Sequence, residues 1–211
     1  MNIYKLNEMT AEKKAYILKR AETDISEQMQ LAKEVSDDIR ARGDKAVLEY
    51  TSKFDRVDLT ADRMKVKPEE IEDGYKRLDA ETREAIEYAA RNIRDFHKKQ
   101  MPEEMWFTEV DKGLLVGEKT TPIVDVCLYV PRGKGSFPSV MLMLGIPAVV
   151  AGVEKIVVVT PPNEQGNVDD AILAAAKIIG ITEIYKVGGI QAVHQVVHDR
   201  RGIDAAVLMF G

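Results

Sequence analysis

The residue types best suited to chemistry gather in two glycine-rich turns in the second half of the chain. The first turn, residues 129–139, reads Tyr-Val-Pro-Arg-Gly-Lys-Gly-Ser-Phe-Pro-Ser. Its glycines permit close backbone approach, and Arg132 and Lys134 add positive charge before an expected helix, which are the ingredients of an anion or phosphate cradle. The spacing fits neither a GxGxxG fingerprint nor a Walker A loop. A tight turn with solvated basic residues is an equally good interpretation.

The second turn, residues 187–192, reads Val-Gly-Gly-Ile-Gln-Ala. Two glycines before a helix open the backbone, and Gln191 in the first helical turn could exchange a hydrogen bond with a ligand. From the residues alone, a close-packing turn without a ligand is the favoured interpretation.

A metal site is the third possibility, because His194 and His198 would share one face of a helix. The glutamate of an HExxH site is absent, although Asp199 could supply a third ligand. A pair of surface histidines is the favoured interpretation. Cys127 lies within an apolar run, where a thiol usually packs as a small hydrophobic group.

Composition excludes several classes of protein. The 211 residues include 30 Lys and Arg against 35 Asp and Glu, giving a net charge of −5 that disfavours a nucleic-acid binder. One cysteine forms no disulfide framework and suits a reducing compartment. The longest apolar stretch, residues 140–153, falls short of the about 20 residues that span a bilayer. Since no signal peptide is recognisable at the N-terminus, we expect a cytoplasmic protein without a membrane partner.

The charge distribution divides the chain into two predicted regions. Charged residues are dense up to residue 112, beyond which the sequence becomes apolar and glycine-rich. We therefore predict a helical N-terminal region over 1–112 and an α/β domain over 113–211, with Trp106 packed at their junction. Helical periodicity in the first region predicts helices over 25–43, 44–54, 68–78 and 81–99.

The second region alternates apolar strands with helices. Strands are expected at 124–130, 155–160, 183–187 and 205–210, and helices at 136–152, 169–179 and 189–198. Strands that are apolar throughout indicate a parallel sheet covered on both faces, and right-handed crossovers then give a doubly wound, Rossmann-like α/β domain. Ligands bind such sheets beyond the carboxyl ends of the strands, which is where both glycine-rich turns lie.

Several segments also follow one another in the order found in a known family. They are residues 42–55, 90–97, 128–139, 146–153, 157–162 and 185–192. Together they resemble histidinol dehydrogenase, whose YVPGGK-x-x-YPS signature is similar to residues 128–139. Arg132 replaces the second glycine of that signature, and Leu144 replaces an asparagine of a neighbouring motif. The resemblance covers residues 1–193, and the family pattern is expected to be lost after Val193.

The resemblance implies an oxidoreductase of histidine biosynthesis. Members of this family use NAD and a bound zinc ion to oxidise L-histidinol through L-histidinal to L-histidine, and they work as homodimers. By the resemblance, Tyr129 and Gln191 match residues that contact NAD.

The resemblance assigns neither a catalytic nor a metal-binding residue to this chain. The family's GPGN segment, its Glu-His acid/base pair and its zinc ligands lie further downstream and find no match here. The expectation is therefore an incomplete sheet domain in a truncated enzyme that is inactive alone. Two alternatives stay open: a non-catalytic module that binds NAD or an anion or dimerises, and a relative that oxidises another amino alcohol or a diol.

Overall fold

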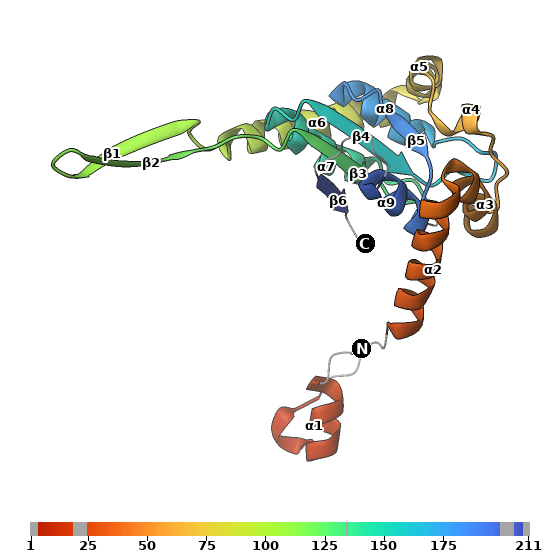
Figure 1. The fold of residues 1–211 in the computed structure, drawn as a ribbon, viewed down its shortest axis with the longest axis horizontal. Coiled ribbons are helices and arrows are strands. Elements are labelled where there is room, and N and C mark those ends of the chain that lie inside the picture. The colour runs from red at the N-terminus through yellow and green to blue at the C-terminus, as the bar shows by residue number, and fades with distance from the viewer. Residues whose placement is uncertain (1–3, 19–24, 134, 199–204, 209–211) are drawn as a thin grey trace. The chain divides into compact units, whose positions relative to one another are not determined.

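The computed structural model describes residues 4–18, 25–133, 135–198 and 205–208. The chain forms two compact units, Met1–Glu34 and Val35–Gly211. The first unit contains a 3-10 helix, η1 (Leu6–Glu8), the helix α1 (Ala11–Leu18) and the beginning of α2 (Ser26–Arg42) (Figure 1). All the candidate site residues belong to the second unit.

A parallel four-stranded sheet organises the second unit. It consists of β3 (Asp125–Tyr129), β4 (Lys155–Thr160), β5 (Ile184–Lys186) and β6 (Ala205–Leu208), in the spatial order β5-β4-β3-β6. The first strand in sequence, β3, lies inside the sheet; the next two extend the sheet on one side of it, and β6 pairs on its other side. This order is that of a doubly wound α/β fold, so the fold class expected from the sequence is confirmed.

Alternate residues of the strands enter two different cores. Leu128 and Val158 pack into a larger core, whereas their neighbours Cys127 and Val159 pack into a smaller one on the opposite face. Successive side chains of a strand point to opposite faces, so a sheet covered on both sides needs apolar residues at every position. That requirement explains the uninterrupted apolar runs in the sequence.

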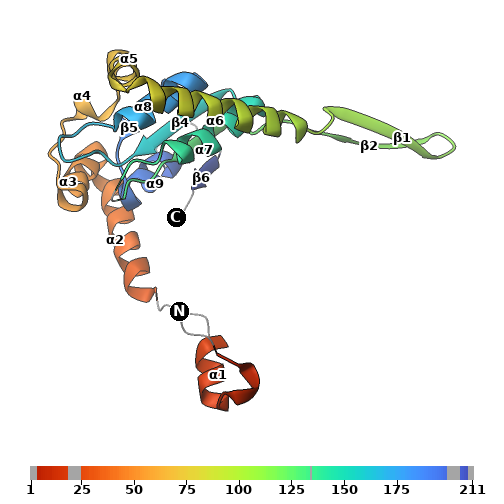
Figure 2. The same ribbon diagram turned by 180° about the vertical axis from the view of Figure 1, so that it is seen from behind.

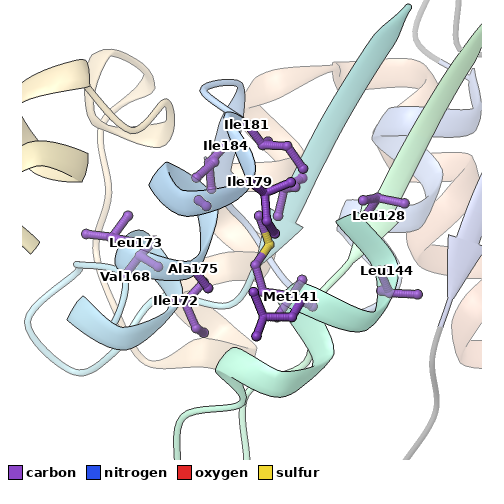
Figure 3. Close-up of a cluster of buried hydrophobic side chains, with 14 of the residues drawn as sticks. Leu128, Met141, Leu144, Val168, Ile172, Leu173, Ala175, Ile179, Ile181 and Ile184 are labelled. Carbon is purple, nitrogen blue, oxygen red and sulfur yellow. The ribbon is translucent and has the colours of Figure 1, made fainter. Parts of the chain in front are cut away.

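Connecting helices cover the two faces. The helices α7 (Pro138–Val150) and α8 (Asp170–Ile179) lie on the face of the larger core, and α9 (Gly189–His198) lies on the other (Figure 1 and Figure 2). Figure 3 shows side chains of the larger core, with Met141 of α7 among leucine and isoleucine side chains. No helix in the described part of the chain is both long and apolar enough to cross a membrane.

The helices of the first region pack on this sheet domain instead of on one another alone. They are α3 (Asp44–Asp55), α4 (Ala61–Met64), α5 (Pro68–Arg77) and α6 (Ala80–Lys99). Ile71 of α5 and Ile86 of α6 are buried in the larger core, whereas Val47 of α3 is buried in the smaller core. The half-apolar faces of these helices are therefore covered by the sheet domain. The proposed domain division at residue 112 stays a prediction.

A two-stranded antiparallel hairpin lies between α6 and β3 and was not expected from the sequence. It is formed by β1 (Met105–Asp111) and β2 (Leu114–Lys119) and projects away from the sheet (Figure 1). Trp106 pairs with Glu118 and is 41% exposed, so the expectation that it packs at a domain junction is wrong. Apolar residues occupy both faces of this hairpin, and the missing alternation hid the strands from periodicity.

Candidate functional site

The two glycine-rich turns meet at the carboxyl end of the sheet. Tyr129, the last residue of β3, accepts a hydrogen bond on its hydroxyl oxygen from the backbone N–H of Gly189, at 3.0 Å. Gly189 begins α9 just after β5, which is separated from β3 by β4. This bond therefore spans the end of the intervening strand and joins turns that are 60 residues apart in the chain.

Two glycines allow the second turn to approach its neighbours closely. A Cβ atom at Gly188 would lie 2.4 Å from Cγ of Pro161, which follows β4. Gly189 has a φ of +59°, in the left-handed region that glycine adopts without strain, and a Cβ there would lie 2.8 Å from Oε1 of Gln191. Close packing against Pro161 explains why residue 188 is a glycine, whereas a glycine at position 189 leaves room for the side chain of Gln191.

Gln191 is the most unusual polar residue of this region because its side chain is fully buried. Its Nε2 donates a hydrogen bond to Oδ2 of Asp55 at 3.3 Å. Its Oε1 is buried and has no hydrogen-bond partner among the described residues. A buried carbonyl oxygen left unsatisfied costs about 1–3 kcal/mol, and such an atom often marks the place of a ligand or an ordered water.

Asp55, the last residue of α3, is a site residue that the sequence reasoning missed. It is half-buried, and this burial raises the pKa of its carboxyl group to about 6, although the positive charge of Arg132 opposes the increase. The only available signal was its position at the end of residues 42–55, one of the segments that resemble histidinol dehydrogenase. That signal named no role for the carboxylate.

Tyr129 remains a neutral phenol at neutral pH. Burial and, to a smaller extent, the nearby charge of Asp55 raise the pKa of its hydroxyl, whereas the hydrogen bond from Gly189 lowers it. Because the hydroxyl oxygen accepts from Gly189, its own proton is available for donation. The phenol and the orphaned Gln191 oxygen thus offer one donor and one acceptor at the same edge of the sheet.

The anion cradle in the first turn stays a prediction. Nε of Arg132 lies 3.5 Å from Oδ2 of Asp169, so its guanidinium already faces a carboxylate. Lys134 lies outside the described residues. Oγ of Ser136 is buried without a hydrogen-bond partner in the described chain, just before α7 begins.

The histidine pair differs from the expected surface pair. His194 is 6% exposed, and its Nδ1 is hydrogen-bonded to Oγ of Ser36 in α2. The side chain of His198 and all of Asp199 lie outside the described residues. Within the described ranges, no group of three or more His, Cys, Asp or Glu residues is placed to hold a metal ion.

Cys127 behaves as its position in an apolar strand suggested. It is 3% exposed in the smaller core, and burial raises the pKa of its thiol to about 12. A thiol with so high a pKa is a poor nucleophile at neutral pH, because the thiolate is the reactive form. The packing interpretation of Cys127 is confirmed.

Together, these features are those of a doubly wound α/β domain with a ligand site at the carboxyl end of its sheet. The sheet is doubly wound, and two glycine-rich turns with an unsatisfied acceptor meet at the carboxyl ends of its strands. That edge is where doubly wound α/β domains bind nucleotides and related ligands.

Comparison with known proteins identifies the family. The family model described as histidinol dehydrogenase matches residues 18–211. The chain is 41% identical over 211 residues to a histidinol dehydrogenase homolog of Rhizobium meliloti (strain 1021), covering 100% of this chain and 46% of that protein. It is also 41% identical over 209 residues to histidinol dehydrogenase of Synechocystis, covering 99% of this chain and 48% of that protein.

A solved structure agrees with the sequence comparisons. The crystal structure of histidinol dehydrogenase from Elizabethkingia anophelis superposes with a TM-score of 0.79 at 36% identity, covering 89% of this chain and 42% of that one. The chain belongs to the histidinol dehydrogenase family, a family of oxidoreductases. It spans about half the length of the curated relatives it matches. Since the family match continues to residue 211, the expectation that the pattern is lost after Val193 is wrong.

Proposed function

We propose that the carboxyl-end cluster is part of the NAD site of an enzyme that oxidises L-histidinol through L-histidinal to L-histidine. The observation that carries this proposal is the buried, unsatisfied Oε1 of Gln191 beside the turn held by Tyr129. The family resemblance supports this proposal, because it implies that both residues match positions that contact NAD. An orphaned acceptor suits this cofactor because the ribose hydroxyls and the carboxamide of NAD are hydrogen-bond donors.

The residues of the cluster then have separate tasks. The Tyr129 hydroxyl fixes the backbone at Gly189, which keeps the turn in the conformation that leaves room for the Gln191 oxygen beside this glycine. Gln191 accepts a hydrogen bond from the cofactor on Oε1. When bound, NAD supplies the hydride acceptor for oxidation of the alcohol.

Zinc binding and acid–base chemistry are assigned elsewhere in the proposed enzyme. The resemblance assigns no residue of this chain to these tasks, and the described residues contain no group of three or more His, Cys, Asp or Glu that could hold a metal ion. We therefore derive no catalytic step from residues 1–211. Assembly as a homodimer and location in the cytoplasm belong to the same proposal.

The test is calorimetric titration of NAD into the 211-residue chain and two of its variants. Gln191→Met keeps a side chain of similar length but removes the Oε1 acceptor together with the Nε2 donor to Asp55, and Tyr129→Phe removes the hydroxyl that holds the turn. Each variant is expected to weaken NAD binding about tenfold or more, which corresponds to about 1.4 kcal/mol and to the loss of one hydrogen bond.

Matched control variants separate the site from general effects of substitution. Gln165→Met and Tyr88→Phe change exposed residues of the same types away from the cluster, and both should bind NAD like the parent chain. Unchanged affinity in Gln191→Met, with folding confirmed by circular dichroism, would exclude Gln191 from the cofactor site. Formation of NADH from L-histidinol, followed by absorbance, measures separately whether this chain completes the reaction.

A further inference from the structure

We propose that Asp55 is a positioning residue of this site, whose carboxylate orients the carboxamide of Gln191 so that Oε1 is presented to the ligand. This inference rests on the proposed function and adds a residue to the site that binds NAD. Asp55 itself is not assigned a contact with the cofactor.

A carboxamide has two chemically different ends, an NH₂ group that donates hydrogen bonds and an oxygen that accepts them. The side chain of Gln191 can exchange its NH₂ and oxygen by a half turn about its last bond, and the two orientations present opposite hydrogen-bonding groups. An ionised carboxylate only accepts hydrogen bonds, so the NH₂ end must face Asp55. The observed bond from Nε2 to Oδ2, at 3.3 Å, has this arrangement, and Oε1 consequently faces Gly189.

The position of Asp55 is fixed by packing. Asp55 ends α3, and the next residue, Arg56, caps that helix in the left-handed conformation with a φ of 58°. The helices α3 and α9 are in contact, and Val47 of α3 and Ala192 of α9 are both fully buried in the smaller core. The distance from the end of α3 to Gln191 is therefore set by a packed interface.

The charge of Asp55 can change within an accessible pH range. Arg132, from the loop after β3, and Tyr129, from β3, act on it, and α9 presents the neutral Gln191, with the titratable His194 one turn further along the same helix. Burial raises the pKa of Asp55 to about 6 despite Arg132. Above this pH the ionised carboxylate accepts only, and below it the protonated carboxyl can also donate. Asp55 therefore fixes the orientation of the Gln191 carboxamide above pH 7 and ceases to do so as the pH falls through 6.

The first experiment observes the carboxamide without any cofactor. The side-chain NH₂ signals of Gln191 are recorded by ¹⁵N NMR between pH 5 and 7.5 and are assigned by their absence in Gln191→Met. We expect these signals to titrate with a midpoint near 6, and we expect Asp55→Asn to abolish the titration. Asp95→Asn, at an exposed position of α6, is the matched control and should leave it unchanged. Signals that do not respond to Asp55→Asn would overturn the proposal.

The second experiment connects this orientation to binding. An asparagine at position 55 carries both a donor and an acceptor and so permits either orientation of Gln191. We expect the parent chain to lose NAD affinity as the pH falls from 7.5 to 5. Asp55→Asn should weaken NAD binding about tenfold at pH 7.5 and remove this pH dependence. Parent-like affinity and pH dependence in Asp55→Asn would contradict the positioning role.

The two experiments fail in different ways. A parent chain that does not bind NAD would refute the proposed function, whereas a titrating Gln191 signal would still demonstrate the coupling to Asp55. A parent chain that binds NAD with no response to Asp55→Asn would refute the inference and leave the proposed function standing.

Discussion

Asp55 should reduce the stability of the fold at neutral pH, and its replacement by asparagine should increase it. The pKa of its carboxyl group rises from 3.8 to about 6 in the folded chain because burial penalises the ionised form. Between pH 3.8 and 6 the folded chain thus binds more protons than the unfolded chain, and stability falls as the pH rises through this window. The loss is complete above pH 7.

The magnitude follows from the size of the shift. Two pKa units at about 1.4 kcal/mol each give an upper bound of about 3 kcal/mol. Because the Asp55 side chain is only half-buried, solvent screening reduces this to about 1–2 kcal/mol. In a domain of this size, such a gain raises the melting temperature by about 2–8 °C.

The assay is urea unfolding of the parent chain, Asp55→Asn and the control Asp95→Asn at pH 7.5 and 4.5. The free energy of unfolding of Asp55→Asn should exceed that of the parent chain by about 1–2 kcal/mol at pH 7.5. This difference should be smaller at pH 4.5, where Asp55 is mostly protonated in the folded chain. The control should follow the parent chain at both pH values. Equal stabilities of Asp55→Asn and the parent chain at pH 7.5 would refute the reasoning, because they would mean that the buried carboxylate carries no penalty.

Two further predictions concern packing and a buried ion pair. A Cβ at Gly74 of α5 would lie 2.8 Å from Cβ of Leu173 in α8. Gly74→Ala should therefore lower the free energy of unfolding by about 1–3 kcal/mol, measured by urea unfolding. An unchanged free energy of unfolding would show that the two helices can separate at no cost. Lys186 is 3% exposed and bonds Glu70 at 2.5 Å; Glu70→Ala, which leaves that ammonium buried and unpaired, should cost about 3–5 kcal/mol in a thermal or urea melt. The free energy of unfolding of Lys186→Met should lie within about 1 kcal/mol of that of the parent chain, because the remaining Glu70 is partly exposed and can be hydrated. A loss of stability as large as that of Glu70→Ala would contradict this expectation.

The sheet could be predicted from the sequence because one physical requirement acts on every strand residue. Each strand is covered on both faces, so runs such as residues 155–160 are apolar throughout, and the helices between them enforce parallel order. The same reasoning placed both glycine-rich turns at the carboxyl edge. Their contact through Tyr129 and Gly189 then follows from the strand order, which no local pattern contains.

The rest of the site depends on packing between distant segments. Asp55 bonds Gln191 across 136 residues, and nothing in the local sequence around either residue encodes that contact. The burial of His194 has a similar origin, because Ser36 of α2 bonds a side chain that helical spacing alone assigned to the surface. Hairpin β1–β2 escaped prediction for the opposite reason: its strands lack the one-sided alternation that sequence periodicity detects.

The two cores contribute unequally to the stability of the fold. The larger core joins the sheet to α5, α6, α7 and α8 and contains most of the buried apolar residues, so it supplies most of the stabilisation from burial. Two groups that oppose folding, the unsatisfied Gln191 oxygen and the partly desolvated Asp55, lie on the side of the smaller core, between α3 and α9. A ligand that donates to Gln191 would remove one of these penalties, so binding itself should stabilise the chain. Of these two unfavourable groups, the Gln191 oxygen is therefore the one that binding is expected to satisfy.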